Sequence, residues 1–441
     1  MVRFGGFSQV IIAITLVVIS VLSELTAEGQ SSPRTTPSRS TQVPLTDSER
    51  AKIARWEAAF RQHLAANGRR YEDMAKSGKA HKYYNLQYIL DALLSMYEAT
   101  DKREYLDTCS KYVDMMIESA VDRGNGIPEW TGDDEVVLWD GKKVSGNRYP
   151  TLLLNDFQGS VAIARLGRLL KEQKGLARTY GDRSAHYLQF VEKNVLGKWL
   201  GARGALPGML NAARNPTKYW SDAASMACRM SVDISHATPS QFCTNLAEEI
   251  AKTFRARLVP RGSGYIWDPT LWIGFDGNQE GCPDTAHSNR EATLVVVAFK
   301  SGVVFSQSDV LRMARTFTDS VWNGSISDPR FANYLNGSNQ PYRKNNYNGD
   351  PAACTHVYDG WIKYGEFDER AQVATEALLE SVLGGKLNGS TVNNGSLYGR
   401  PCLLAYATYN LVFRKWKSSN QHAVKGRRPP AGRREPSTRE S

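Results

Sequence analysis

The amino-acid sequence predicts an all-α protein in which helical hairpins, six or seven pairs of them, close into an (α/α) toroid. Segments with apolar residues at helical spacing come in pairs that are separated by short polar breaks. No convincing run of alternating strand residues interrupts them. Stacked helix pairs form either a solenoid or a closed toroid. The long loops between the pairs favour the toroid, where such loops gather at one end and wall a cleft.

The clearest hairpin lies on either side of the break "TDKRE". Within this break, Asp101 is expected to cap the second helix, and Glu104, three residues on, to complete a capping box. The apolar stripes of the two helices comprise Leu86, Ile89, Leu90, Leu93, Leu94 and Tyr97, and then Tyr105, Leu106, Cys109, Tyr112, Val113 and Met116.

The same pattern recurs along the chain. It predicts paired helices at 157–170 and 184–200, at 291–300 and 308–322, and at 358–364 and 371–382. Further helices are expected at 47–66, 240–257 and 401–416. The stretch 258–275, "LVPRGSGYIWDPTLWIGF", allows a short β-hairpin beside the helices.

The two ends of the chain differ from the helical part. Arg3 and the apolar run 10–22, which is too short for a comfortable membrane span, predict a signal peptide over residues 1–27. An uncleaved anchor is the alternative. Residues 28–45 form an expected Ser/Thr/Pro-rich linker, residues 46–416 the toroid, and residues 417–441 a basic disordered tail. The protein is therefore expected to be secreted.

Six cysteines fit an oxidising compartment, in which an even number permits full pairing. The C-x-x-C spacing of a zinc site is absent, which favours disulfides over metal. A bond between Cys228 and Cys243 is the expected local pair, and pairing within residues 282–354 is a second possibility. The sequons at Asn323, Asn336, Asn388 and Asn394 are potential glycan sites, although Asn-Gly is also an ordinary turn.

The formal net charge of +10 indicates an anionic partner. Charge alone leaves acidic polysaccharide, nucleic acid and membrane surfaces open. No Gly-rich phosphate loop, serine nucleophile elbow or HExxH motif is present. No cluster of ligands in the sequence indicates a metal, and no cofactor is expected.

Aromatic side chains are concentrated in and beside the expected loops. Aromatic faces suit sugar rings, but bases stack on them too, so they do not separate glycan from nucleic acid. Aromatic anchors that pack loops against the core are the alternative for about half of this set. The set comprises Trp130, Trp139, Tyr149, Trp220, Trp267, Trp272, Tyr342 and Tyr347.

Three segments, "YYNLQYILDALLSMYEATDKREYLD", "DTAHSNREATLVVVAF" and "YDGWIKYGEFDERAQ", resemble the helical-toroid polysaccharide lyases that cleave alginate and glucuronan. The resemblance covers most of residues 80–415. Helical toroids also carry glycoside hydrolases, epimerases and unsaturated-uronyl hydrolases. The resemblance implies β-elimination of a 4-linked uronate, with a Tyr as base and acid and with His, Asn or Arg neutralising the carboxylate. The expected partner is then an anionic polysaccharide, with no nucleic acid and no membrane after signal cleavage.

The chemistry explains these residue types. Elimination removes the proton at C5 of the sugar, which is too weakly acidic unless the adjacent carboxylate is masked. Pre-set donors to that carboxylate stabilise the enediolate-like transition state by about 3–4 kcal/mol each. A Tyr beside a cation can take the C5 proton and return a proton to the leaving O4.

The stretch 282–302, "CPDTAHSNREATLVVVAFKSG", places His287, Asn289 and Arg290 at the start of a predicted helix, where free N–H groups and the dipole favour anions. His287 is the expected neutraliser or base, and Asn289 and Arg290 are expected to hold the carboxylate. Helix capping and local ion pairing are the alternatives. Tyr342 and the adjacent Arg343 are the expected catalytic Tyr and its cation. The remaining candidates for substrate contact are Asn155, Tyr84, Asn85, His236 and Trp130.

Two other functions remain open on the sequence alone. A glycoside hydrolase needs two carboxylates, for which Asp156 and Glu129 are the pair to test. A secreted glycan-binding protein without turnover is the third possibility. His356 lies among apolar residues and is expected in the core rather than in catalysis.

Overall fold

The computed structural model describes residues 43–124, 126–132, 136–137, 143–144, 151–200, 221–267, 282–339, 354, 356–386 and 395–416. Within these residues the protein is mostly helical, which confirms the predicted all-α class. The strands of this part form three short antiparallel hairpins: β1 (Val121–Asp122) with β2 (Pro128–Glu129), β3 (Val136–Val137) with β4 (Lys143–Val144), and β5 (Val259–Arg261) with β6 (Gly264–Ile266). The last of them confirms the hairpin expected from residue 258 onward.

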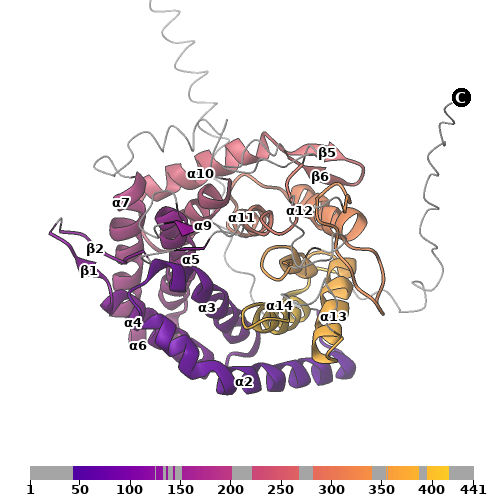
Figure 1. Ribbon diagram of the computed structural model, residues 1–441, viewed down its shortest axis with the longest axis horizontal. Coiled ribbons are helices and arrows are strands. Elements are labelled where there is room, and N and C mark those ends of the chain that lie inside the picture. Colours follow the sequence, from indigo (N-terminus) through magenta and orange to yellow (C-terminus); the bar gives the residue numbers. More distant parts are fainter. Residues whose placement is uncertain are drawn as a thin grey trace, which may run out of the picture.

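The helices divide into an inner and an outer set (Figure 1). The inner elements are α3 (Ala80–Thr100), α5 (Thr151–Glu172), α9 (Ser221–Ala237), α11 (Asn289–Lys300), the 3₁₀ helix η6 (Trp361–Glu366) and α14 (Gly399–Phe413). The outer helices are α2 (Asp47–Ala75), α4 (Arg103–Glu118), α6 (Lys174–Gln189), α10 (Gln241–Arg255), α12 (Gln307–Arg315) and α13 (Glu369–Leu383). Two π-helical turns, η2 (Phe190–Leu196) and η4 (Thr316–Val321), and the short helix α7 (Gly197–Leu200) extend the outer set.

The inner elements contact one another in a closed sequence, which we call the inner circuit. α3 packs on α5, α5 on α9, α9 on α11, α11 on η6 and η6 on α14, and α14 returns to α3. Each outer helix packs on an inner neighbour: α4 on α3, α6 on α5, α10 on α9, α12 on α11 and α13 on η6, while α2 spans α3 and α14. Inner and outer elements therefore alternate along the chain, as paired helices predict.

The apolar pattern of each helix matches its layer. The outer helix α10 buries Leu246, Ile250 and Phe254, which recur every four residues and form one face. By contrast, the inner helix α14 is buried almost all round, from Gly399 to Phe413. A helix that is apolar on all sides is stable only when neighbours cover it completely, so this sequence difference sets the layer that each helix joins.

The turn between α3 and α4 corrects one prediction. Asp101 does not cap α4, because it adopts a left-handed backbone (φ 60°) and ends α3, with its N–H donating to the carbonyl of Tyr97 at 2.8 Å. Lys102 takes the N-cap position of α4, without a side-chain cap. The predicted capping box between Asp101 and Glu104 is therefore wrong. A capping box does start α2, where Thr46 and Glu49 exchange hydrogen bonds.

Most of the predicted hairpins otherwise lie close to the observed helices, but the helix predicted at 184–200 begins earlier, because α6 starts at Lys174 and η2 and α7 continue it to Leu200. The segment 308–322 is α12 followed by the π-helical turn η4, and 358–364 is only the short 3₁₀ helix η6. Helix α9 was not predicted. Gly360 precedes η6 at a very close approach, where an added Cβ would lie 1.9 Å from the carbonyl oxygen of Asn289. A side chain does not fit there, so this glycine lets η6 pack against the start of α11.

All six cysteines are buried and none of them forms a disulfide, so the predicted bond between Cys228 and Cys243 is not formed. The two residues lie on neighbouring helices, α9 and α10, but Cys228 Sγ instead contacts the carbonyl of Ala247 at 3.5 Å. Cys282 and Cys354 likewise form no disulfide, so the second possibility, pairing within residues 282–354, is not formed either. Burial raises the pKa of Cys228 to about 12 and that of Cys243 to about 11, which keeps these thiols protonated.

The predicted signal peptide (1–27), most of the linker (28–45) and the basic tail (417–441) lie outside the described residues. Among the helices that are described, none combines the length and the apolar character needed to cross a bilayer.

Candidate functional site

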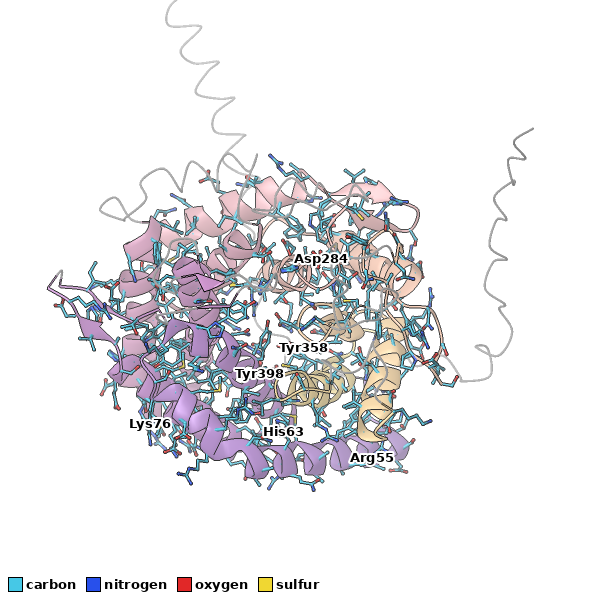
Figure 2. All side chains as sticks on the ribbon, in the orientation of Figure 1. Arg55, His63, Lys76, Asp284, Tyr358 and Tyr398 are labelled. Atoms are coloured by element: carbon cyan, nitrogen blue, oxygen red, sulfur yellow. The ribbon has the colours of Figure 1, made fainter. Side chains whose placement is uncertain are left out.

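Polar side chains from four inner helices meet at the N-terminal end of the inner circuit. They are Tyr84 near the start of α3, Gln158 on α5, Asp222 at the start of α9 and Arg290 at the start of α11. With Asp284 and His287, which immediately precede α11, we call them the Arg290 cluster. Figure 2 shows Asp284 and Tyr358 on the inner side of the molecule, whereas Arg55 belongs to the outer helix α2.

Arg290 holds this cluster together. Its Nε donates to Gln158 Oε1 at 3.0 Å, and its Nη1 contacts Asp222 Oδ2 at 2.9 Å. Its Nη2 donates to the hydroxyl of Tyr84, and the guanidinium carbon lies 5.5 Å from the centre of the Tyr84 ring. Arg290 is only 6% exposed. All three guanidinium nitrogens therefore contact protein groups. Arg290 positions Tyr84 and is not an open binding site for a substrate carboxylate.

Asp284 orients His287. Its Oδ1 accepts a hydrogen bond from the His287 backbone N–H at 2.9 Å and lies 3.0 Å from His287 Nδ1. Asp284 is buried, whereas the His287 side chain is 28% exposed. A carboxylate on Nδ1 fixes the ring orientation and favours a proton on that nitrogen. Asp284 therefore fixes the orientation of the His287 imidazole, which remains partly accessible to solvent.

Asp222 lies between the guanidinium and the imidazole. Burial raises its pKa, while the positive charge of Arg290 and then that of His287 lower it, and the Asp284 carboxylate raises it. Its Oδ1 is buried and makes no hydrogen bond within the described part of the chain. We conclude that this carboxyl oxygen keeps hydrogen-bonding capacity for another group.

Tyrosine rings line one side of the cluster. Tyr88 packs edge-on against Tyr358 with ring centres 5.3 Å apart, and Tyr398 lies 6.3 Å from Tyr88. Tyr358 is buried, whereas Tyr88 and Tyr398 are partly exposed. Partly exposed aromatic rings beside charged groups are typical of carbohydrate sites, where a ring binds a sugar face and the polar groups bind its substituents.

His356 adjoins the cluster and is half-buried rather than a core residue. Burial, and then the nearby His287, lower its pKa to about 4. Its carbonyl accepts a hydrogen bond from Asn289 Nδ2 at 2.6 Å. His356 is thus a neutral imidazole beside His287 at ordinary pH, a role that the sequence analysis did not predict.

Asn289 has a structural role instead of the expected contact with substrate. Its Nδ2 also donates to the carbonyl of Ala286 at 2.8 Å, and its Oδ1 accepts from the backbone N–H groups of Gly360 and Trp361 at 2.8 and 3.3 Å. The side-chain amide therefore uses both its donor and its acceptor to attach η6 to α11.

The other asparagine candidates lie at the same end of the circuit. Asn155 is 4% exposed, and its Nδ2 has no hydrogen-bond partner among the described residues. Asn85 is partly exposed and donates to the carbonyl of His81 at 3.4 Å. Both remain candidates for substrate contact by their position, and neither hydrogen-bonds to Arg290.

Trp130 and His236 lie away from the cluster. Trp130 is 2% exposed, donates through Nε1 to the carbonyl of Met116 at 2.7 Å and packs on Tyr83, so it is an anchor of the core. His236 is near the C-terminal end of α9, where Nε2 lies 3.3 Å from the carbonyl of Ser301. The structure therefore separates His236 from the N-terminal end of the circuit.

Tyr342 and Arg343 lie outside the described residues. The chain runs from that segment into His356 and η6, whose neighbour is α11. Their expected catalytic roles remain predictions.

The alternative carboxylate pair, Asp156 and Glu129, is bridged by the partly buried Lys198. Lys198 Nζ lies 2.5 Å from Glu129 Oε2 and 3.1 Å from Asp156 Oδ2, and Trp199 Nε1 donates to the same Asp156 oxygen at 2.8 Å. Burial raises the pKa of Asp156 to about 6. The pair is thus tied into a structural contact between α5, α7 and β2, which disfavours its use as two catalytic carboxylates.

Sequence reasoning missed Asp222, Asp284 and Gln158 as members of the site. A usable signal was present, because each lies near the start of a helix of the inner layer, as Asn155 and Arg290 do. Within the described residues, no group of three or more His, Cys, Asp or Glu side chains is arranged to hold a metal. No protein-family model matches the chain, and neither a curated protein nor a solved structure matches it.

Proposed function

We propose that the protein is a secreted polysaccharide lyase that cleaves a 4-linked uronate polysaccharide by β-elimination at the Arg290 cluster. We further propose that the inner circuit and its outer helices form an (α/α) toroid. The observation that carries the proposal is the hydrogen bond from Arg290 to the hydroxyl of Tyr84, beside the Asp284–His287 pair. This elimination requires a tyrosine that is hydrogen-bonded to a cation and an imidazole whose orientation is fixed.

In the proposed reaction, the Tyr84 oxygen takes the proton from C5 of the uronate. The electron pair of that C–H bond forms the double bond between C4 and C5, and the bond from C4 to O4 breaks. The leaving O4 accepts a proton, which the Tyr84 hydroxyl returns. Arg290 donates to the same phenolic oxygen and so stabilises negative charge there during the transfer.

His287 has the proposed role of masking the substrate carboxylate. Its Nδ1 faces Asp284, which orients the ring, and its side chain is accessible. Since Arg290 is already engaged by Asp222 and Gln158, it is not the neutraliser expected from the sequence. The net charge of +10 supports an anionic substrate by attracting it over longer distances.

Asp222 favours a second candidate function, hydrolysis of a glycosidic bond. A buried carboxyl group with a raised pKa is the usual form of a general acid in glycosidases. Asp284, whose charge acts on Asp222, would be the second carboxylate. This candidate replaces the Asp156 and Glu129 pair, which Lys198 occupies.

One experiment separates these functions. The purified full chain is incubated with alginate, glucuronan and glycosaminoglycans, and the ultraviolet absorbance of the unsaturated uronate is followed together with the release of reducing ends. Elimination gives both signals, hydrolysis gives reducing ends alone, and a glycan-binding protein gives neither. Reducing ends without the absorbance, or no turnover on any of these polymers, would overturn the lyase proposal.

A further inference from the structure

A cavity of about 870 Å³ lies at the end of the inner circuit opposite the Arg290 cluster. Its wall is made by the C-terminal halves of the inner helices, with Glu98 of α3, Arg168 of α5, His236 of α9, Lys300 of α11 and Tyr409 of α14 among its residues. Its volume is that of an ordinary small-molecule site. The proposed lyase reaction does not use it.

Most charges in this wall are paired within the protein. Arg168 contacts Asp233 at 2.6 Å and Glu172 at 2.7 Å. Lys300 contacts Glu366 at 3.0 Å and donates to the hydroxyl of Tyr409 at 2.6 Å. These pairs need no ligand to balance their charge.

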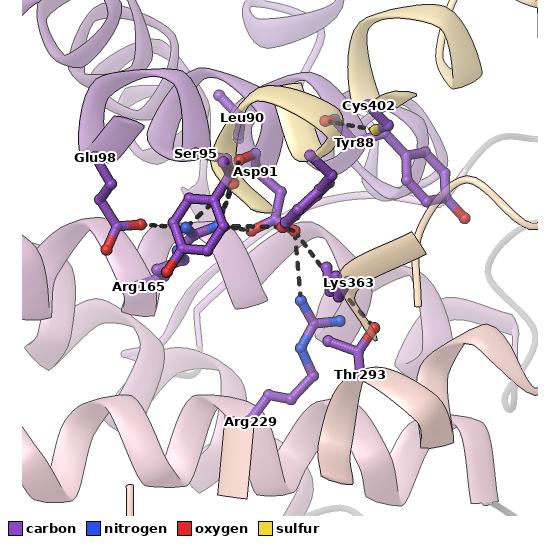
Figure 3. A network of polar contacts seen from close by, with 12 residues as sticks. Tyr88, Leu90, Asp91, Ser95, Glu98, Arg165, Arg229, Thr293, Lys363 and Cys402 are labelled. Carbon is purple, nitrogen blue, oxygen red and sulfur yellow. Dashed lines mark hydrogen bonds and ion pairs between the residues drawn. The ribbon is translucent and has the colours of Figure 1, made fainter. Parts of the chain in front are cut away.

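Asp91, at the inner end of the cavity, is shared among several cations (Figure 3). Its carboxylate pairs with Arg165 and, at 3.1 Å, with Lys363, and it accepts a hydrogen bond from the Tyr406 hydroxyl at 2.6 Å. Together these charges lower the pKa of Asp91 far below its usual range, despite its burial. Asp91 therefore carries one negative charge that three positive groups face, with Arg229 as the third.

Arg229 is the least satisfied of these cations. Its Nη2 lies 3.8 Å from Asp91 Oδ2, beyond hydrogen-bond distance, and its guanidinium makes no hydrogen bond to any described residue. Yet Arg229 is only 6% exposed and lines the cavity. A buried guanidinium that lacks hydrogen-bond acceptors is costly unless a ligand provides them.

We propose that this cavity binds a small polyhydroxy monocarboxylate, whose carboxylate pairs with Arg229. Guanidinium binds carboxylate through two parallel N–H···O bonds, which supplies the missing acceptors. The hydroxyl groups of the ligand suit the carboxylates and the Tyr409 hydroxyl of the outer wall.

The acidic residues of the wall decide between anion classes. Glu98, Glu172, Asp233 and Glu366 all line the cavity, and they repel a second negative charge on a ligand. A dianion such as inorganic phosphate is therefore expected to bind more weakly than a monocarboxylate.

The test uses the full chain and three probes in calorimetric titration. D-Gluconate is a polyhydroxy monocarboxylate, sorbitol is the matched polyol without the carboxylate, and inorganic phosphate is the dianion. Gluconate should bind with one site per chain, and sorbitol and phosphate at least about tenfold more weakly. No gluconate binding, or tighter binding of phosphate, would overturn the proposal.

Three variants locate the site. Arg229→Gln should weaken gluconate binding by at least about tenfold. Val297→Phe, on the α11 wall, should weaken it by filling the cavity without changing charge. Arg290→Gln, at the other end of the circuit, should leave it unchanged. If Arg229→Gln does not fold, Val297→Phe and Arg290→Gln still decide the location. Binding that survives Val297→Phe, or that is lost only in Arg290→Gln, would contradict it.

Discussion

Lys363 Nζ lies 3.1 Å from Asp91 Oδ2, so a contact between residues 272 positions apart in the chain crosses the interior of the molecule. The two residues belong to η6 and α3, which are not neighbours in the inner circuit because α14 lies between them. Lys363 also contacts Asp359 at 3.0 Å and donates to Thr293 of α11 at 3.3 Å. Asp91 thereby links five of the inner elements through Arg165, Arg229, Lys363 and Tyr406.

Replacing Asp91 by Asn should destabilise the fold strongly. The amide has nearly the same shape but no charge, which leaves Lys363 and Arg165 buried without their shared counter-ion. The expected loss is about 3–5 kcal/mol in the free energy of unfolding, measured by urea denaturation. Asp47→Asn is the control, because Asp47 is 97% exposed in its pair with Arg50 and should cost less than about 0.5 kcal/mol. Equal losses of unfolding free energy in the two variants would show that the buried ion pairs of Asp91 contribute no more to stability than an exposed ion pair.

Tyr84→Phe should lower turnover of the uronate polymer by at least about 10²-fold, the lower end of what a positioned acid–base group contributes. The ring still packs, so the thermal midpoint should change little. Tyr180→Phe is the matched control, since that hydroxyl also accepts a hydrogen bond from an arginine, Arg103, at 3.2 Å, but lies far from the Arg290 cluster, on the outer helix α6. The role that the sequence predicts for Tyr342 gives the opposite result: loss of turnover in Tyr342→Phe and near-normal turnover in Tyr84→Phe.

His287→Ala should also reduce turnover per folded molecule, because it removes the group that masks the substrate carboxylate. If His287 serves only to complete the turn before α11, the variant should instead lose about 1 kcal/mol of stability and keep near-normal turnover. Specific activity measured beside the thermal midpoint distinguishes the two. Asp284→Asn, which keeps the side-chain shape, should lower turnover in the same direction by releasing the imidazole.

Acid should destabilise the protein partly through His356. Its pKa is lowered to about 4 in the folded chain, chiefly by burial, whereas an unfolded histidine titrates near 6.5. Between these two pKa values the histidine is protonated in the unfolded state but not in the folded state. The free energy of unfolding therefore falls as the pH decreases from about 6.5 to about 4. The free energy of unfolding of wild type should therefore drop more over this range than that of His356→Gln, by up to about 3 kcal/mol. Parallel curves would refute the assignment, and the opposite titration of Asp156 cancels in the comparison.

The six cysteines should remain as thiols in the folded protein. Peptide mapping without reductant should find no disulfide, and adding reductant should leave the thermal midpoint unchanged. A thiol reagent should react with the cysteines only after denaturation, because all six are buried and those with raised pKa values are protonated. A mapped bond between Cys228 and Cys243 would restore the prediction made from the sequence.

The helices could be predicted from the sequence because the side chains that each helix buries recur at helical spacing. α10 and α14 differ in just the way that one-sided and complete burial require, and the starts of α2 and α11 carry recognisable capping or turn residues. Helix α9 was missed because its sequence, "SDAASMACRMSVDISHA", has small residues that favour neither a strong apolar stripe nor a strong polar face.

The site was harder to predict, because its members come from parts of the chain that only the closed circuit brings together. Arg290 was named as a candidate from the sequence, yet its partners Tyr84, Gln158 and Asp222 are 206, 132 and 68 positions away. Local pairing with Glu291 or Asp284 was the alternative that the sequence offered. Asn289 was assigned to substrate for the same reason, since the Gly360 backbone that it binds is 71 residues away.

Helix α14, the last of the described chain, packs on both α2 and α3, the first two. The chain can therefore be opened at another place without changing which helices are neighbours. Arg414 reinforces this packing, with its guanidinium donating to Glu49 at 2.6 Å and to the carbonyl of Pro44 at 2.9 Å. A circular permutant that connects residue 416 to residue 43 by a flexible linker, and opens the chain at the exposed β5–β6 turn around Gly262, would preserve every helix pair. It would also convert the long-range closure between α14 and α3 into a local one, so that folding should nucleate at a different part of the same structure.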